Sequence, residues 1–177
     1  MSEFIEFPKI ARLSRNIVVT EKIDGTNACV RIGEDGSFDV GSRTQWITPD
    51  RDNHGFAAWA YAHRDELMQL GPGLHFGEWW GQGIQRKYGL TEKRFSLFNT
   101  SRWREYRPSC CHCVPVLYEG IFDTAEILRC LDSLERVGSL AAPGFSNPEG
   151  VIVYHIAGNI YFKKTIHKDE VPKGMQA

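Results

Sequence analysis

The chain has 177 residues and a formal net charge of −1, and 42% of its residues are hydrophobic while 24% are charged. This length suits one domain with a sizeable core, and the composition is that of an ordinary globular protein. The near-neutral charge excludes a strongly basic coat that binds nucleic acid regardless of sequence, but it leaves room for a local basic groove.

The N-terminus shows no basic region that leads into an apolar segment, and no later stretch is long and apolar enough to span a bilayer. The five cysteines are an odd number, and three of them crowd together at 110–113, which is unlike a disulfide framework. We therefore expect a soluble protein without a membrane partner. We expect it to be located in the cytoplasm of a cell or of a phage-infected host.

The first third of the chain predicts strands. β-branched residues indicate a strand over 16–21, and the pair Asp24-Gly25 indicates a turn. A returning strand is expected over 28–32 and another near 38–41. We expect these strands to form an antiparallel meander.

Helices and further strands follow. Residues 55–70 suit a helix that Gly71-Pro72-Gly73 ends, and residues 124–137 suit a second helix. Short strands are expected over 74–80, 95–99, 114–118, 150–154 and 159–165. Strands cluster between single helices without regular βαβ alternation, so the expected fold class is α+β with antiparallel sheets.

The run Glu21-Lys22-Ile23-Asp24-Gly25-Thr26-Asn27 contains the spacing Lys-x-Asp-Gly. That short motif arises by chance in roughly 4% of chains of this length, so it is weak alone. Further motifs follow it in order: Ser42-Arg43, Phe76-Gly77-Glu78, Phe98, Pro148-Glu149-Gly150-Val151-Ile152-Val153 and Lys163-Lys164. The ordered set is more specific than any of its members.

This set resembles the covalent nucleotidyltransferases, which comprise DNA ligases, RNA ligases and mRNA capping enzymes, from about residue 17 to residue 165. The run around Lys22 is most similar to the RNA ligase branch typified by the second RNA ligase of T-even phages. The resemblance implies an ATP-grasp-like adenylyltransferase core, in which two antiparallel β-sheets with flanking helices form a nucleotide-binding cleft. It also implies ATP and Mg²⁺ (or Mn²⁺) as cofactors.

A lysine amine is a nucleophile only when it is unprotonated, and with a pKa near 10.4 only about one lysine in a thousand is neutral at neutral pH. Desolvation, a nearby cation or a metal lowers that pKa. A tight turn flanked by cationic groups meets this need. We therefore expect Lys22 to take AMP from ATP as a covalent lysyl-AMP.

The resemblance implies a role for each motif residue. Lys22 would carry the nucleotide covalently, and Asp24 would orient the lysine or a metal-bound water. The nucleoside would be bound by Glu21, which reads the adenine, by Glu78 at the ribose and by Phe98, which stacks on the purine. Phosphate or metal would be bound by Asn27 (phosphate or hydrated metal), Arg43 (phosphate), Glu149 (magnesium) and Lys163 (α-phosphate), with Thr165 in the second position of the last motif. For Asp24, an ordinary turn residue is the alternative.

Two departures from the family pattern stand out. Many relatives carry Lys-x-Lys, whereas Lys163 and Lys164 are adjacent here and point to opposite faces of a strand. We expect Lys163 to face the phosphate. No C-terminal or OB domain is evident in residues 1–177, so we expect a single nucleotidyltransferase domain and leave open a protein partner that supplies a further one.

The predicted function is ATP-dependent, RNA-ligase-like joining of nucleic acid, at RNA ends or in a nicked duplex. Three alternatives stay open: a DNA ligase, a capping-type guanylyltransferase that uses GTP, and a module that binds nucleotide or RNA without catalysis.

Three other features were weighed. Cys110 and Cys113 have zinc-like spacing but lack a second ligand pair, so we expect a surface loop with free thiols there. Arginines interleaved with aromatics over 102–107, and the run 85–88, either contact RNA or are ordinary solvated loops. His75 is expected to be a core histidine.

Overall fold

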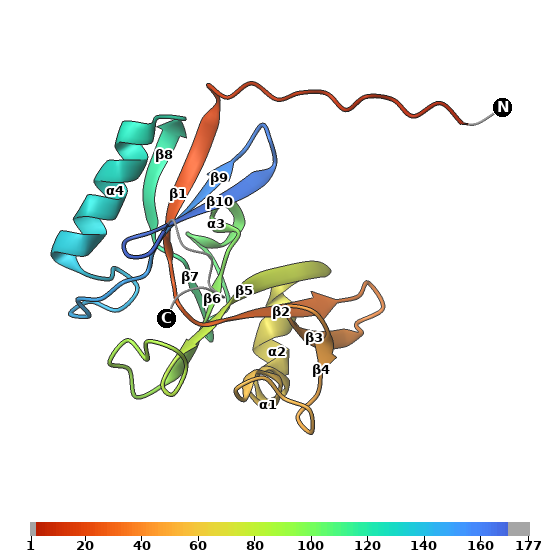
Figure 1. Cartoon of the computed structure of the whole chain (residues 1–177). Helices are drawn as coiled ribbons and strands as arrows, with labels where there is room; N and C mark the ends of the chain where they lie inside the picture. The colour runs from red at the N-terminus through yellow and green to blue at the C-terminus, as the bar shows by residue number, and fades with distance from the viewer. Residues whose placement is uncertain (1–2, 170–177) are drawn as a thin grey trace.

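A computed structural model describes residues 3–169 and consists of two β-sheets with helices packed beside them (Figure 1). The strands are β1 Asn16–Lys22, β2 Thr26–Ile32, β3 Phe38–Ser42, β4 Trp46–Ile47, β5 Gly73–Gly81, β6 Lys93–Leu97, β7 Cys111–Cys113, β8 Val116–Ile121, β9 Gly150–His155 and β10 Ile160–Thr165. The helices are α1 Phe56–Ala62, α2 Arg64–Leu67, the 3-10 turn η1 Met68–Leu70, α3 Thr100–Trp103 and α4 Thr124–Val137.

The strands form a four-stranded sheet in the order β10-β9-β1-β8 and a six-stranded sheet in the order β4-β3-β2-β5-β6-β7. All of these pairs are antiparallel except β6 with β7, which is parallel. The predicted α+β class with two largely antiparallel sheets and flanking helices is therefore confirmed.

The predicted meander is wrong at its first turn. β1 pairs with β8 and β9, whereas β2 pairs with β3 and β5 in the other sheet. Asp24-Gly25 does turn the chain, but it carries the chain from one sheet to the other instead of closing a hairpin. A turn signal is local, while the choice of a strand partner depends on residues far along the chain.

The six-stranded sheet is one continuous insertion into the four-stranded one. Strands β2 to β7 lie within residues 26–113, and β1 and β8 to β10 on either side of them build the other sheet. The chain thus crosses between the sheets at 23–25 and at 114–115. The two crossings are neighbours, because the Glu21 N–H donates to the Pro115 carbonyl oxygen over 3.0 Å.

Helix α4 covers one face of the four-stranded sheet (Figure 1). The Asp123 side chain caps it by accepting from the Ala125 N–H over 2.8 Å, and Gly138, with φ of 91°, ends it. The core beneath it contains Ile17, Val19, Ile127, Cys130, Leu134, Val151 and Val153. Because β1 alternates, its even-numbered residues face away from α4.

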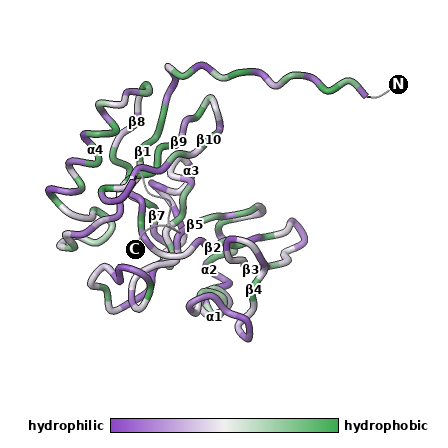
Figure 2. The backbone as a smooth tube through the Cα atoms, in the orientation of Figure 1, coloured by the Kyte–Doolittle hydropathy of each residue, from purple (hydrophilic) through white to green (hydrophobic). Residues whose placement is uncertain are grey.

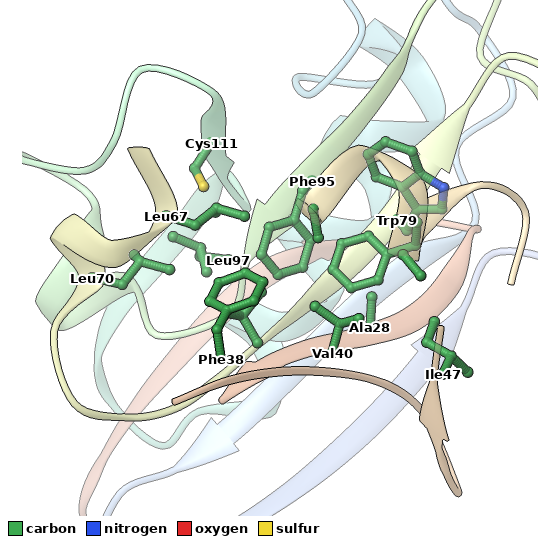
Figure 3. Packing of buried hydrophobic residues seen from close by; sticks show 14 of the residues in the cluster. Ala28, Phe38, Val40, Ile47, Leu67, Leu70, Trp79, Phe95, Leu97 and Cys111 are labelled. Atoms are coloured by element: carbon green, nitrogen blue, oxygen red, sulfur yellow. The ribbon is translucent and has the colours of Figure 1, made fainter. Parts of the chain in front are cut away.

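A larger core lies between the six-stranded sheet and helices α1 and α2 (Figure 3). Trp79 and Phe95 from the sheet pack against Phe56 of α1, with ring centroids 5.4 and 5.0 Å from that of Phe56. Each such buried side chain contributes about 1.5–3 kcal/mol by leaving water. This core makes the insertion a rigid support for the strands that carry the site.

The helix predicted over 55–70 is broken into α1, α2 and η1. His63 leaves helical geometry at φ −104° and ψ 18°, and its ring nitrogen bonds the Trp59 carbonyl oxygen over 2.9 Å. Hydrophobic spacing alone does not reveal such a break. The short elements β4, β7 and α3 were not predicted either.

The predicted surface loop at 110–113 is wrong in part. Residues 111–113 form β7, and Cys111 is only 4% exposed because it packs into the larger core. Within residues 3–169, no three His, Cys, Asp or Glu side chains gather closely enough to hold a metal ion.

The segment before β1 extends away from both sheets (Figure 1) and mixes hydrophobic with hydrophilic residues (Figure 2). Phe4, Ile5 and Phe7 in it are at least three-quarters exposed. Across the described residues, no helix has the length and apolar character needed to cross a membrane.

Candidate active site

The Lys22 motif occupies the first crossing between the sheets. Lys22 is the last residue of β1, and β2 begins at Thr26. The Asp24 N–H donates to the Tyr88 hydroxyl over 2.7 Å, and the Gly25 N–H donates to Glu78 Oε1 over 3.0 Å. Two successive amides of the crossing are thus held by side chains from the six-stranded unit.

Gly25 lets this crossing lie directly on β5. A Cβ atom at this position would lie 2.4 Å from the Trp79 carbonyl oxygen and 2.7 Å from Trp80 Cβ. Neither neighbour is the free end of a flexible side chain, so the backbone itself would have to move. The glycine therefore sets how closely the lysine turn approaches Glu78.

We expect Gly25→Ala to lower the free energy of unfolding by about 1–3 kcal/mol, the usual cost of overpacking. Urea unfolding measures this loss. Gly36→Ala is the control, because a Cβ there meets nothing within 4 Å and bears only the strain of φ +78°. A smaller loss in Gly25→Ala than in Gly36→Ala would contradict the close approach.

Lys22 and Glu149 form an ion pair. Lys22 Nζ lies 2.5 Å from Glu149 Oε2, and the two side chains are 18% and 6% exposed. Glu149 precedes β9, and the β1–β9 register pairs Lys22 with Gly150, so adjacent strands bring the two charges together. The buried carboxylate fixes the lysine amine at the crossing.

Glu78 is the third charged group of this cluster. Burial raises its pKa to about 7, although Lys22 and the Gly25 N–H oppose the rise, and the carboxylates of Glu149 and Asp24 add to it. Near neutral pH the Glu78 side chain is therefore divided between its protonated and its charged form.

This raised pKa predicts a pH-dependent stability. The folded chain binds the Glu78 proton more tightly than the unfolded chain does, so this contribution is fully present below pH 4.5 and is lost as pH rises through about 7. Glu78→Gln removes the titration. Between about pH 5 and pH 8, the free energy of unfolding of the variant should rise relative to that of the unsubstituted protein by at most about 3 kcal/mol.

Urea midpoints of the two proteins at both pH values measure this gain. A difference between the proteins that is the same at acidic and at alkaline pH would count against a raised pKa for Glu78.

The register of the last strands separates the two adjacent lysines. Lys163 pairs with Ile152, which pairs with Thr20, so Lys163 lies on the face of the sheet that carries Lys22. Lys164 pairs with Val151 and lies on the opposite face, where its Nζ is 2.9 Å from Asp169 Oδ2.

Thr165 also belongs to the Lys22 face. It pairs with Gly150, which pairs with Lys22, so one row across three strands carries the lysine, a glycine and the threonine. The Thr165 hydroxyl donates to the His167 carbonyl oxygen over 3.0 Å.

A cavity of about 630 Å³ opens between the sheets. Val18 and Tyr154 line it from the four-stranded sheet, and Asn27, Phe76 and Phe98 line it from the six-stranded sheet and its end. Val18 shares the Lys22 face of β1, so the cavity extends from the lysine's side of the sheet. Of the predicted site residues, only Asn27 and Phe98 line it; the charged cluster lies beside it.

One predicted residue turns its side chain away from the cluster. Glu21 is 1% exposed and points to the opposite face of β1, where its carboxylate accepts from the Ser139 hydroxyl and from the N–H groups of Leu140 and Ala141. Burial raises its pKa. Its side chain therefore does not face the cavity, and only its backbone remains for reading a base. Arg43 is exposed, just after β3.

Sequence reasoning missed the contacts of Arg86 and Tyr88. Arg86 Nε donates to Asp24 Oδ2 over 3.0 Å and its Nη1 donates to the Asn147 carbonyl oxygen over 3.1 Å. The sequence of this run is compatible with either an RNA contact or a solvated loop. The one local signal in the sequence is the pair of glycines that flank this run. They indicate an irregular loop, but they do not indicate which residues Arg86 and Tyr88 contact.

The arginines over 102–107 are engaged within the protein. Arg102 donates to the Leu70 carbonyl oxygen, Arg104 pairs with Glu119, and Arg107 donates to the Trp103 carbonyl oxygen. His75 is 3% exposed and bonds the Gly71 carbonyl oxygen over 2.8 Å, so the expected core histidine is confirmed.

The donor set fits a hydrated divalent cation. Magnesium at phosphate sites is usually held by one or two carboxylates together with water and substrate phosphates. Glu149 offers a buried carboxylate whose cationic partner is Lys22.

The chain resembles a known protein family and several solved structures. The family model described as RNA ligase matches residues 15–168. No curated protein sequence matches significantly. The solved structures that match include RNA ligases of Naegleria gruberi: a ligand-free variant with a TM-score of 0.63 and 20% identity, and a variant with AMP and Mn with 0.60 and 19%.

A further match is a variant with ATP and Mn, with a TM-score of 0.57 and 20% identity. The alignments cover 86%, 86% and 85% of this chain and 50%, 50% and 48% of those chains, so this chain spans about half the length of these relatives.

Proposed function

Since this chain belongs to the RNA ligase family, we propose that it is an ATP-dependent RNA-ligase-like nucleotidyltransferase that carries AMP on Lys22. The observation that supports this most is the Lys22–Glu149 pair, with Glu78 beside it, at the crossing between two sheets that enclose a cavity. We propose that residues 1–177 act as one nucleotidyltransferase domain.

The first step joins Lys22 to AMP. The ammonium loses a proton, for which Glu149 is the hydrogen-bonded acceptor. The freed lone pair attacks the α-phosphorus, a P–N bond forms, and the bond to pyrophosphate breaks with its electron pair leaving on pyrophosphate. Positioning and neutralisation of charge supply most of the acceleration in such transfers.

The next steps move AMP to nucleic acid. An oxygen of a 5′-phosphate end attacks the lysyl-AMP phosphorus, the lysine nitrogen takes back the proton that Glu149 accepted, and the P–N bond breaks with its electron pair staying on nitrogen, which returns the amine. A 3′-hydroxyl then attacks the activated 5′-phosphate, loses its proton and releases AMP, so a phosphodiester bond joins the ends. RNA ends or a nicked duplex are the proposed substrates, in line with the family.

The cavity and its rim supply the nucleotide contacts. Phe98 stacks on the purine, Glu78 accepts from a ribose hydroxyl, and the Glu21 backbone meets the base edge. Asn27, Arg43 and Lys163 contact phosphate, with Thr165 near Lys163. The Naegleria relatives with ATP or AMP and Mn support this use of the cleft. Glu149 would hold Mg²⁺ or Mn²⁺, which when bound neutralises phosphate charge.

Intact protein mass after incubation with ATP and Mg²⁺ tests the first step. The expected gain is one AMP, about 329 Da added through a P–N bond. A gain with GTP and none with ATP would identify a guanylyltransferase instead. No gain with either nucleotide would favour a module that only binds.

The substrate is tested separately, with nicked duplexes of RNA and of DNA. Sealing of the RNA nick is expected, and sealing of the DNA nick alone would identify a DNA ligase.

A further inference from the structure

Arg86 joins two segments that are far apart in the sequence. Its Nε donates to Asp24 Oδ2, two residues after Lys22, and its Nη1 donates to the carbonyl oxygen of Asn147, two residues before Glu149. Lys22 and Glu149 are themselves in contact. The contacts therefore close a ring that contains the nucleophile, the buried carboxylate and the guanidinium.

The ring connects both sheets. Lys22 ends β1 and Glu149 precedes β9 in the four-stranded sheet, whereas Arg86 lies in the loop from β5 to β6 of the six-stranded sheet. A guanidinium suits this place because its planar fork can donate in two directions at once. An ammonium carries its three N–H donors on a single nitrogen and lacks this fork.

The loop that carries Arg86 is strained. Gln85, Lys87 and Tyr88 have φ of 44°, 60° and 52°, in the left-handed region that residues other than glycine rarely adopt. Such a backbone persists where its surroundings hold it. Tyr88 anchors this loop, because it is 2% exposed, packs on Trp80 and Phe145, and accepts from the Asp24 N–H.

Two residues of this loop hydrogen-bond to Asp24: Arg86 donates to its carboxylate, and the Tyr88 hydroxyl accepts from its backbone N–H. The Arg86 side chain is 28% exposed and that of Asp24 is 16% exposed, so their ion pair is partly shielded from solvent. A solvated surface arginine would have neither partner fixed in this way.

We propose that Arg86 is a positioning residue that sets Lys22 and Glu149 in register for attack on the α-phosphate. Arg86 touches neither reacting atom; it acts through Asp24 and through the Asn147 backbone. This inference rests on the proposed function, and it assigns the loop between β5 and β6 to the adenylylation step and not to contact with RNA.

Arg86→Ala is expected to lower the maximal rate of lysyl-AMP formation about 100-fold, because displacement of a reacting group by about 1 Å has that effect. The ATP concentration at half-maximal rate should stay within about threefold, since Arg86 does not line the cavity in which the nucleotide is proposed to bind. Added guanidinium ion should restore part of the rate. Single-turnover adenylylation, followed by intact mass, measures all three.

Two further variants complete the design. Arg86→Lys keeps the charge but lacks the planar fork that reaches Asp24 and Asn147 from two different nitrogens, so a reduced rate at unchanged half-saturation is expected. This variant decides the matter if Arg86→Ala does not fold. Arg129→Ala is the matched control, because Arg129 is 68% exposed on α4 and, within residues 3–169, its ion-pair partner is Glu126. It should react at the unsubstituted rate.

A full adenylylation rate in Arg86→Lys together with a loss confined to RNA sealing would overturn the inference. So would a rate that falls only in proportion to the unfolded fraction. Amide hydrogen exchange gives a reading that needs no catalysis: in Arg86→Lys, exchange should accelerate in both 22–26 and 147–149. If the unsubstituted protein gains no AMP, the proposed function fails, while the exchange data still test the ring.

Discussion

Replacing Lys22 by alanine is expected to reduce the gain of AMP by about 10³-fold or more, because the attacking nitrogen is removed. Intact mass after incubation with ATP and Mg²⁺ measures this, and peptide mapping of the unsubstituted protein should find the adduct at Lys22. Retention of the adduct in Lys22→Ala would mean that another residue is the nucleophile.

Lys22→Arg separates chemistry from folding. Alanine leaves the 6% exposed Glu149 carboxylate without its cation, which destabilises the fold in addition to ending catalysis. Arginine keeps a positive charge there, but it stays protonated and cannot attack phosphorus. We expect Lys22→Arg to melt near the unsubstituted protein and still gain no AMP, whereas Lys22→Ala melts lower. Adenylylated Lys22→Arg would refute the assignment.

The second large effect is expected at Lys163. Lys163→Ala should slow lysyl-AMP formation about 10²- to 10³-fold, since it removes a cation from the face where charge develops on the phosphate. Lys164→Ala is the matched control one residue away. It breaks the ion pair with Asp169, whose other carboxylate oxygen still accepts from the Thr165 N–H and hydroxyl, and should keep the rate within about threefold.

Initial rates of adenylylation at saturating ATP compare the two variants. The reverse order, with Lys164→Ala slow and Lys163→Ala fast, would show that the strand faces are assigned the wrong way round. Equal rates for the two variants would show that neither lysine of β10 contributes to adenylylation.

The elements that the sequence predicted well are those with local causes. Helix α4 was expected over 124–137 and spans Thr124–Val137. Its cap at Asp123, its stop at Gly138 and its buried face all lie within the helix or beside it. The partners of β1 were predicted wrongly, because β8 and β9 lie about a hundred or more residues away and no local pattern specifies them.

The charged cluster was predictable in its main members. Lys22, Glu78 and Glu149 were expected together from the order of the motifs, and they meet at the crossing. Strand alternation also separated Lys163 from Lys164. The same rule, applied to Glu21 beside Lys22, would have sent the Glu21 side chain to the α4 face. The contacts of Arg86 could not be predicted from the sequence, since its partners are brought to it by the tertiary fold.

The double crossing of the chain also bears on how the two sheets can move. The sheets are joined covalently only at 23–25 and at 114–115, and these links are side by side. Two adjacent links define a single hinge axis, and Lys22 lies next to it. A rotation of one sheet against the other about these links would displace Lys22 less than Tyr161, which lines the cavity in register with Val18, four residues before Lys22. In the proposed nucleotidyltransferase, such a rotation would widen the cleft for a nucleotide while Lys22 stays near the axis.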